Sequence, residues 1–432
     1  MAADGPSETL MQRRPARHGY AVGVVDLFLK MVLSAATSFR GAAVVLDLLA
    51  GRLPGLEQTP CFNSGRLWLL RIGLYRLTCR KQKADDWVWM MDHTLQLGPY
   101  KCLVIIGIRL SAWGRTRPLE HGDMTLLNLT PMEKSSGRRV WEALEATAQI
   151  TGPPRAVVSD GGTDLKRGME LLREVHPQVR HQHDMKHKNA LLLKRELQRD
   201  SRWDQFVKQA TRTKLATTQT SLAFLNPPGL KTKARYMNLD TLVRWGERAL
   251  AYLDASDHVP DLPVDRDTLQ EKLGWLRSYR PALRRWAELL AIARTAEKLV
   301  QGGIHRSLCD ELQTQLRTMG TTPAGRRMRD AVLAFLAEQA AGLCVDERLI
   351  GSTEVLESII GKYKRLQSSY SKGGMTAMLL SIGTMLGKLT PRTIKRALET
   401  IRTTDVDTWC TQHLGVTLQS QRRLAVGATK TG

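Results

Sequence analysis

Acidic residues stand where an α/β protein could build a metal site. Asp92 follows the apolar and aromatic segment 87–91, and Asp160 follows the short apolar segment 156–159. A buried carboxylate is costly unless a cation or a hydrogen-bond donor accompanies it. The two glycines after Asp160 let a metal ion or another backbone approach closely. We expect both aspartates at the ends of strands, on the rim of a sheet where α/β sites commonly form.

A third group of acidic residues lies far downstream, in the segment 354–364. Its apolar residues share one helical face, at positions 355, 356, 359, 360 and 363. Glu354, Glu357, Gly361 and Lys364 share another face, which presents carboxylates and a cation. Carboxylates that converge on two Mg²⁺ ions about 3.5–4 Å apart can cut or transfer a phosphodiester. Mg²⁺ prefers oxygen ligands of this kind.

Each acidic position also has a plainer interpretation. An aspartate after a strand is often a turn or helix-capping residue. Glu354 and Glu357 would also suit the first turn of any exposed helix, because negative charge is favourable there. Helical periodicity leaves open which of the two glutamates is functional. The acidic groups favour a metal site only when they are taken together, in their order along the chain.

The composition is that of a folded and strongly basic protein. The 432 residues are 42% hydrophobic and 25% charged, and 64 Lys and Arg stand against 42 Asp and Glu, a net charge of +22. This excess attracts polyanions, so we expect nucleic acid as the partner, ahead of a membrane surface. The six cysteines contain no CxxC pair, and neither a membrane-spanning run nor a signal peptide is expected. A reduced cytoplasm fits these features.

The N-terminal part is predicted to be helical. Residues 19–84 contain segments with helical apolar spacing, and Asn63 or Ser64 could cap the last of them. The basic residues of that last helix include Arg66, Arg71 and Arg76. A basic final helix is typical of a helix-turn-helix, which places this helix in the major groove of DNA. A three-helix bundle with a solvated basic face would show the same pattern.

The middle of the chain predicts a mixed sheet with helices packed on it. Expected strands lie at 87–91, 101–110 and 156–160, with a helix at 137–150 and another starting near Thr163. Residues 190–350 lose almost all strand character, which predicts a helical insertion. Thr390 and Pro391 are a suitable cap and first residue for a last helix, 391–402.

The predicted divisions follow from these patterns. They are a flexible arm (1–18), a helical DNA-binding domain (19–84), the first part of an α/β core (85–199), an all-helical insertion (200–350), the C-terminal core helices (351–405) and a basic tail (406–432).

Three motifs together resemble the DD(E/D) transposases of bacterial insertion sequences. They are WVWMMDHT at 87–94, VVSDGGTDL at 157–165 and ExxESxxGKxK at 354–364. The resemblance implies an RNase H-like core interrupted by an all-helical domain. It also implies Asp92, Asp160 and Glu357 as catalytic ligands of two Mg²⁺ or Mn²⁺ ions, with Glu354 as a supporting acid. His93 departs from the pattern, because a small residue is expected after the first aspartate.

A further segment, HDMKHK at 183–188, resembles the C/D-x-x-H motif of the same transposases. Its members here are Asp184 and His187, which we expect to support the metal ligands. From the residues themselves, Asp184 could cap a helix that starts near Met185, with His187 at the same end. Lys186 and Lys188, like Lys364 downstream, are candidate contacts to DNA phosphates.

The resemblance implies a nucleoid-associated enzyme that binds the terminal inverted repeats of its element, cleaves DNA and joins the freed 3′-hydroxyl to target DNA. A homodimer or larger assembly that holds two double-stranded ends is implied as well. Two alternatives remain open: a non-catalytic DNA-binding regulator derived from such an enzyme, and an RNase H-like nuclease.

Overall fold

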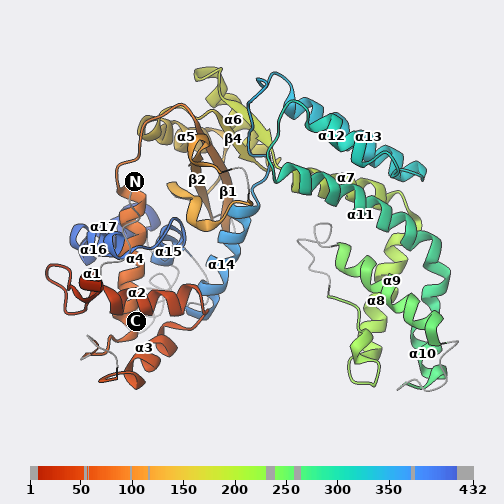
Figure 1. The fold of residues 1–432 in the computed structure, drawn as a ribbon, viewed down its shortest axis with the longest axis horizontal. Coiled ribbons are helices and arrows are strands. Elements are labelled where there is room, and N and C mark those ends of the chain that lie inside the picture. Colours follow the sequence, from red (N-terminus) through yellow and green to blue (C-terminus); the bar gives the residue numbers. More distant parts are fainter. Residues whose placement is uncertain are drawn as a thin grey trace, which may run out of the picture. The chain divides into compact units, whose positions relative to one another are not determined.

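A computed structural model describes residues 8–52, 56, 58–97, 100–114, 117–229, 239–256, 264–370 and 375–415. The chain forms two compact units: Met1–Gln182 with Thr353–Gly432, and His183–Ser352. The first unit combines a mixed sheet with helices, whereas the described part of the second is helical apart from His183, which ends a strand of that sheet, and one bridge between Ile304 and Leu349 (Figure 1). This arrangement agrees with the predicted α/β core that is accompanied by helical regions.

The sheet has five strands in the order β3-β2-β1-β4-β5. Their bounds are Trp87–Leu97 (β1), Tyr100–Arg109 (β2), Thr125–Met132 (β3), Ala156–Ser159 (β4) and Arg180–His183 (β5). β1 is antiparallel to β2 and parallel to β4, and β2 is antiparallel to β3. The mixed character of the sheet was predicted, but the edge strand β3 was not.

Two helices cover one face of the sheet, α5 (Gly137–Thr151) and α6 (Thr163–Val175). Side chains from alternate positions of β1, such as Trp89 and Met91, form a buried core with Val140 and Leu172 of these helices. The two helices pack closely because α6 has a glycine at the contact. A Cβ added at Gly168 would lie 2.4 Å from Val140 Cγ1. Both helices were predicted, α5 from its apolar spacing and α6 as the helix that starts near Thr163 after the two glycines.

The N-terminal helices pack against helices from the other end of the chain. They are α1 (Glu8–Gln12), α2 (Val22–Leu33), α3 (Phe39–Leu48) and α4 (Phe62–Thr78), which lie with η6 (Ala377–Leu380), α15 (Ser381–Met385), α16 (Pro391–Thr400) and α17 (Thr403–Leu414). At the centre, a Cβ on Gly73 of α4 would lie 1.8 Å from the carbonyl oxygen of Leu380. The helix α4 is thus an internal element of the first unit.

Several predicted boundaries in this region were wrong. The cap of α4 is Cys61, not Asn63 or Ser64, because the helix begins at Phe62. The predicted last helix is present as α16, with the hydroxyl of Thr390 accepting from Thr393 N, but α17 follows it and extends into the predicted tail. The predicted arm contains α1, and its first seven residues lie outside the described part, as do residues 416–432 of the tail.

The second unit is built from helices around an aromatic core. Its main helices are α7 (Met185–Gln198), α8 (Ser201–Thr217), α9 (Leu239–Ser256), α10 (Arg266–Leu273), α11 (Arg280–Val300), α12 (Leu308–Gln315) and α13 (Pro323–Ala340). Trp203 and Trp286 are almost completely buried, with ring centroids 4.8 Å apart, and Phe206 contacts both rings. The unit begins before the predicted position 200, since α7 packs on α11 and α13.

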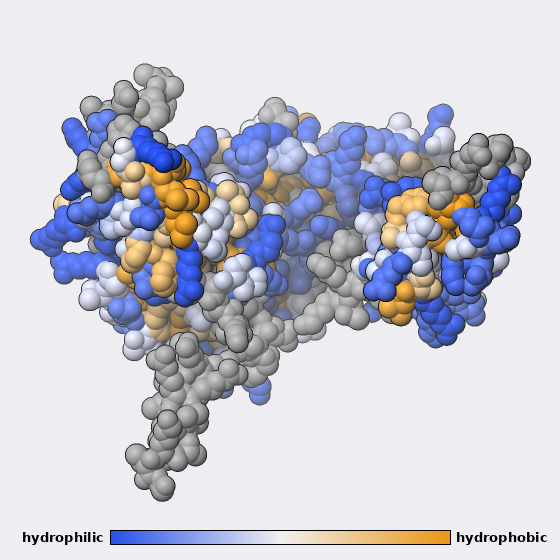
Figure 2. Space-filling model, turned by 90° about the horizontal axis from the view of Figure 1, so that it is seen from below, coloured by the Kyte–Doolittle hydropathy of each residue, from blue (hydrophilic) through white to orange (hydrophobic). Residues whose placement is uncertain are grey.

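Figure 2 shows a face on which hydrophilic residues predominate and apolar residues form separate patches. Large exposed apolar side chains include Val44, Leu48 and Leu215. Among the described helices, none combines the length and the apolar character needed to cross a membrane.

Candidate active site at the end of the parallel strand pair

Asp92 and Asp160 come from neighbouring strands. The parallel register of β1 and β4 ends at Met91 opposite Ser159. The residue that follows is an aspartate in both segments, Asp92 after Met91 and Asp160 after Ser159. The prediction that Asp92 ends its strand was wrong. β1 continues to Leu97, with Asp92 opposite Val104, because the antiparallel β1–β2 pair is longer than the parallel pair. What ends at Asp92 is the pairing with β4.

The carboxylate of Asp160 is held by the glycine turn that follows it. Asp160 Oδ1 accepts a hydrogen bond from Gly162 N at 3.0 Å. A Cβ added at Gly162 would lie 3.1 Å from Asp160 Oδ1 and 3.3 Å from Asp164 Oδ1. Oxygens of two carboxylates therefore flank this glycine. A side chain there would crowd both of them, which gives the predicted role of the glycines a physical basis.

Asp164 belongs to a polar cluster that sequence reasoning did not identify. Its Oδ2 lies 3.3 Å from Lys101 Nζ and 3.8 Å from His93 Nε2, and His93 Nε2 lies 3.1 Å from Ser135 Oγ. Burial opposes ionisation of Asp164, but the Ser135 hydroxyl, His93 and Lys101 outweigh it and lower the pKa of the carboxyl. The available signal was the spacing of Asp160 and Asp164, four residues apart across the start of a helix.

His93 occupies the position where a small residue was expected. Its ring points to Ser135 and Asp164, while its backbone N donates to Asp92 Oδ1 at 2.6 Å. Burial lowers the pKa of His93, and the charge of Lys101 adds to this effect, against the opposing charges of Asp164 and Asp160. Ser135 and Asp164 thus accommodate the imidazole ring of His93 next to Asp92.

The third acidic group lies on α14 (Glu354–Tyr370), which packs against β1 (Figure 1). Its predicted apolar face is buried, at Val355, Leu356, Ile359, Ile360 and Tyr363. Glu354 is exposed and Glu357 is half-buried. A metal ion would need one carboxylate oxygen from each of its ligands within 4.8 Å of the others. Among the described residues, Asp92, Asp160 and Glu357 do not form such a group. The three acids therefore belong to adjoining elements but do not surround a single ion position.

Asp184 caps a helix, as predicted from its sequence position. The nearly fully buried Asp184 precedes α7, and its Oδ1 accepts from His187 N at 2.8 Å and lies 3.2 Å from His187 Nδ1. The ring of His187 is therefore oriented by the capping carboxylate. Further along the same helix, Lys188 Nζ lies 5.0 Å from the ring centroid of Phe335, a cation–π contact.

Two of the predicted DNA-contacting arginines donate to backbone carbonyls within the first unit. Arg71 donates to Ile401 O at 2.6 Å and Leu398 O at 2.5 Å, and Arg76 donates to Lys388 O at 2.7 Å. Burial lowers the pKa of Arg76 to about 10. These cations join α4 to the C-terminal helices. Arg66 is half-buried on the same helix, whereas Lys364 is exposed on α14.

Comparisons with known proteins give no family assignment. No family model and no curated protein matches the chain. Among solved structures, one similar chain belongs to the Drosophila P element transposase strand transfer complex, with a TM-score of 0.39 and 10% sequence identity, over 87% of this chain and 97% of that chain. A TM-score and an identity this low do not establish a shared fold.

Proposed function

We propose that the protein is a DNA transposase of the DD(E/D) type. The observation that carries the proposal is the position of Asp92 and Asp160 on adjacent residues of the β1–β4 pair, with the acid-bearing helix α14 packed on β1. The acids follow one another along the chain in the order that this chemistry uses in the family that the motifs resemble. The net charge of +22 suits a DNA substrate.

The residues present fit a divalent metal centre. Carboxylate oxygens are the ligands that Mg²⁺ and Mn²⁺ prefer, and two of them, Asp160 Oδ1 and Asp164 Oδ1, lie 3.1 and 3.3 Å from the position of a Cβ at Gly162. Asp92, Asp160 and Glu357 would hold two ions, with Glu354, Asp184 and His187 as supporting groups. Bound metal would supply activation of the attacking oxygen and stabilisation of the leaving oxygen.

The chain's own residues would position the metal ligands and the DNA. The hydrogen bond from Gly162 N holds Asp160 Oδ1, and the backbone N of His93 holds Asp92 Oδ1. We place DNA phosphates on Lys186, Lys188, Lys364 and Arg66, but not on Arg71 and Arg76, whose donors serve the fold. Binding of terminal inverted repeats by the N-terminal helices, and a homodimer that joins two ends, complete the proposal.

One observation favours an alternative function. Since the oxygens of the three acids are not gathered within 4.8 Å in the described structure, a non-catalytic DNA-binding regulator with the same charge remains the second candidate. A nuclease that cleaves without joining is the third.

A strand-transfer assay separates these functions. The purified full chain is incubated with labelled DNA ends of the element that encodes it, a supercoiled plasmid, and either Mg²⁺, Mn²⁺ or EDTA. The proposal expects plasmid-joined label with Mg²⁺ or Mn²⁺ and none with EDTA. Cleavage without joined product would indicate a nuclease, and shifted DNA without cleavage in any metal would indicate a regulator.

A further inference from the structure

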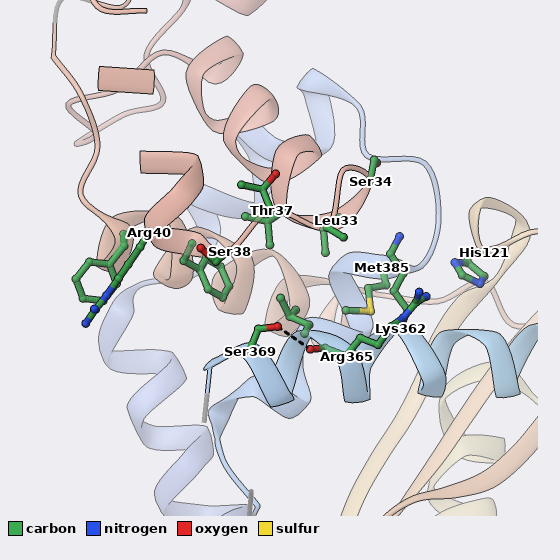
Figure 3. Close-up of a pocket in the computed structure, with 15 residues that line it drawn as sticks. Leu33, Ser34, Thr37, Ser38, Arg40, His121, Lys362, Arg365, Ser369 and Met385 are labelled. Carbon is green, nitrogen blue, oxygen red and sulfur yellow. Dashed lines mark hydrogen bonds between the residues drawn. The ribbon is translucent and has the colours of Figure 1, made fainter. Parts of the chain in front are cut away.

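A large pocket lies in the first unit, and neither Asp92 nor Asp160 lines it. Its volume is about 830 Å³, within the range of small-molecule sites. The turn between α2 and α3 forms one wall, and the second half of α14 forms the other. Figure 3 shows Lys362, Arg365 and Ser369 on α14 opposite Leu33 and Thr37. Because these elements are far apart in sequence, only the folded chain reveals the pocket.

The charged side chains that line this pocket are all positive. Its lining includes Arg40, Lys362, Arg365 and His121, and no aspartate or glutamate among the residues that the structure describes. Among the described residues, no carboxylate forms an ion pair with Lys362 or Arg365, which stand one helical turn apart on the same wall. Like charges at this spacing are mutually unfavourable. Burial lowers the pKa of Lys362, and the charge of Arg365 lowers it further, which indicates uncompensated positive potential.

Apart from Ser34, Thr37, Ser38 and Ser369, the remaining lining is apolar and aromatic. Leu33, Phe62, Leu366 and Met385 belong to it, and the Arg40 guanidinium lies 5.1 Å from the ring centroid of Phe62. The side chain of His121 is oriented by Ser358, with Nε2 3.1 Å from Ser358 Oγ. A ligand that fits both the cationic and the apolar side chains has an anionic group and a flat, weakly polar body.

We propose that this pocket binds a nucleotide, with its phosphate on Lys362 and Arg365 and its base against the apolar wall. Arginine and lysine form charge-assisted hydrogen bonds with phosphate oxygens, and bases stack on aromatic and guanidinium planes. The volume of the pocket accommodates one or two nucleotide units.

The nucleotide can be a free molecule or an unpaired unit of a DNA strand. Lys362 and Arg365 lie five and eight residues beyond Glu357, or about 8 to 12 Å along the helix. A strand that runs past the acids would thus place a neighbouring nucleotide at the pocket. This second source rests on the proposed function, whereas binding of a nucleotide as such does not.

Calorimetric titration of the full chain in EDTA tests the proposal without requiring catalysis. The probes are dAMP, a 5′-phosphorylated thymidine dinucleotide, inorganic phosphate and deoxyadenosine. We expect dAMP or the dinucleotide to bind, and deoxyadenosine and phosphate to bind much more weakly. A dinucleotide that binds at least about tenfold tighter than dAMP identifies a DNA strand as the source; equal or tighter binding of dAMP identifies the free nucleotide.

Variants localise the binding. Lys362→Ala and Arg365→Ala should each weaken binding of the tighter-binding probe by about tenfold. Ser369→Trp should block binding of this probe, because the larger side chain fills the pocket. Arg173→Ala, which removes an exposed charge from α6, is the matched control. Unchanged binding in Lys362→Ala, Arg365→Ala and Ser369→Trp, or deoxyadenosine binding as tightly as dAMP, would overturn the proposal. If the wild-type chain binds the nucleotide but gives no strand transfer, that result would count against the proposed function alone.

Discussion

Asp92 and Asp160 lie one residue beyond the last pair of the parallel β1–β4 ladder, where Met91 is opposite Ser159. Adjacent parallel strands bring residues from distant parts of a chain into one register. The two carboxylates therefore occupy neighbouring positions, although β1 itself continues past Asp92. This relationship underlies the proposed metal centre.

The first prediction concerns the acidic residues. Asp92→Asn, Asp160→Asn and Glu357→Gln should each reduce Mg²⁺-dependent DNA cleavage by at least about a hundredfold, because the amide is a poor ligand for a hard cation. DNA binding in EDTA should stay within about twofold of wild type, measured by electrophoretic mobility shift. Glu170→Gln, on the solvent-facing side of α6, serves as the control. Cleavage retained by any of the three variants would remove that residue from the proposed set.

A second prediction concerns the stability contributed by Arg71. Its guanidinium donates to the carbonyls of Leu398 and Ile401 at the end of α16. Arg71→Ala removes both hydrogen bonds and leaves the Ile401 carbonyl without this donor, while Leu398 O keeps its contact with His18 Nε2 at 3.2 Å, so the free energy of unfolding should fall by about 1–3 kcal/mol. Urea denaturation followed by circular dichroism measures the change. Arg80→Ala, at an exposed position just beyond α4, should change the stability by less than about 0.5 kcal/mol. A smaller loss for Arg71 than for Arg80 would contradict this role.

The third prediction concerns the cap of α7. Asp184→Ala removes the acceptor of His187 N, and the free energy of unfolding should fall by about 0.5–2 kcal/mol. Asp184→Asn should recover most of this loss, because asparagine also caps helices. If DNA cleavage follows stability in both variants, Asp184 acts only as a cap. If Asp184→Asn is stable but inactive, the carboxylate has a further role in the chemistry.

A fourth prediction concerns acid sensitivity. Burial and the neighbouring Arg71 lower the pKa of His18 in the folded state, although the Leu398 carbonyl and Glu399 oppose the shift. The unfolded chain then binds the proton more readily, so the contribution of His18 to stability is complete above about pH 6.5 and is lost as the pH falls below that value.

His18→Gln should accordingly reduce the loss of unfolding free energy between about pH 7.5 and 5.5, measured by urea denaturation at both pH values. The unfolding free energy of the variant should still fall somewhat with falling pH, since burial lowers the pKa of His121, His305 and His413 as well. An equal or steeper slope in His18→Gln would show that His18 is not responsible.

Local patterns predicted the elements that carry the candidate site. The apolar spacing of α14, the short strand before Asp160 and the cap at Asp184 were all correctly read, because each depends on residues within a few positions of one another. The edge strand β3 escaped prediction. Its sequence contains Pro131 and Asn128, which weaken the strand signal, and its pairing with β2 stabilises it.

The partners of these elements emerge only when the chain is folded. The order of amino acids alone indicates which residues are acidic, which helices are amphipathic and that the chain is strongly basic. It could not determine that Arg71 and Arg76 donate to carbonyls more than three hundred residues away, that Asp164 joins Lys101, or that α14 and the α2–α3 turn enclose a pocket. The physical reason is that burial and long-range hydrogen bonds depend on which surfaces meet, and periodicity describes each surface alone.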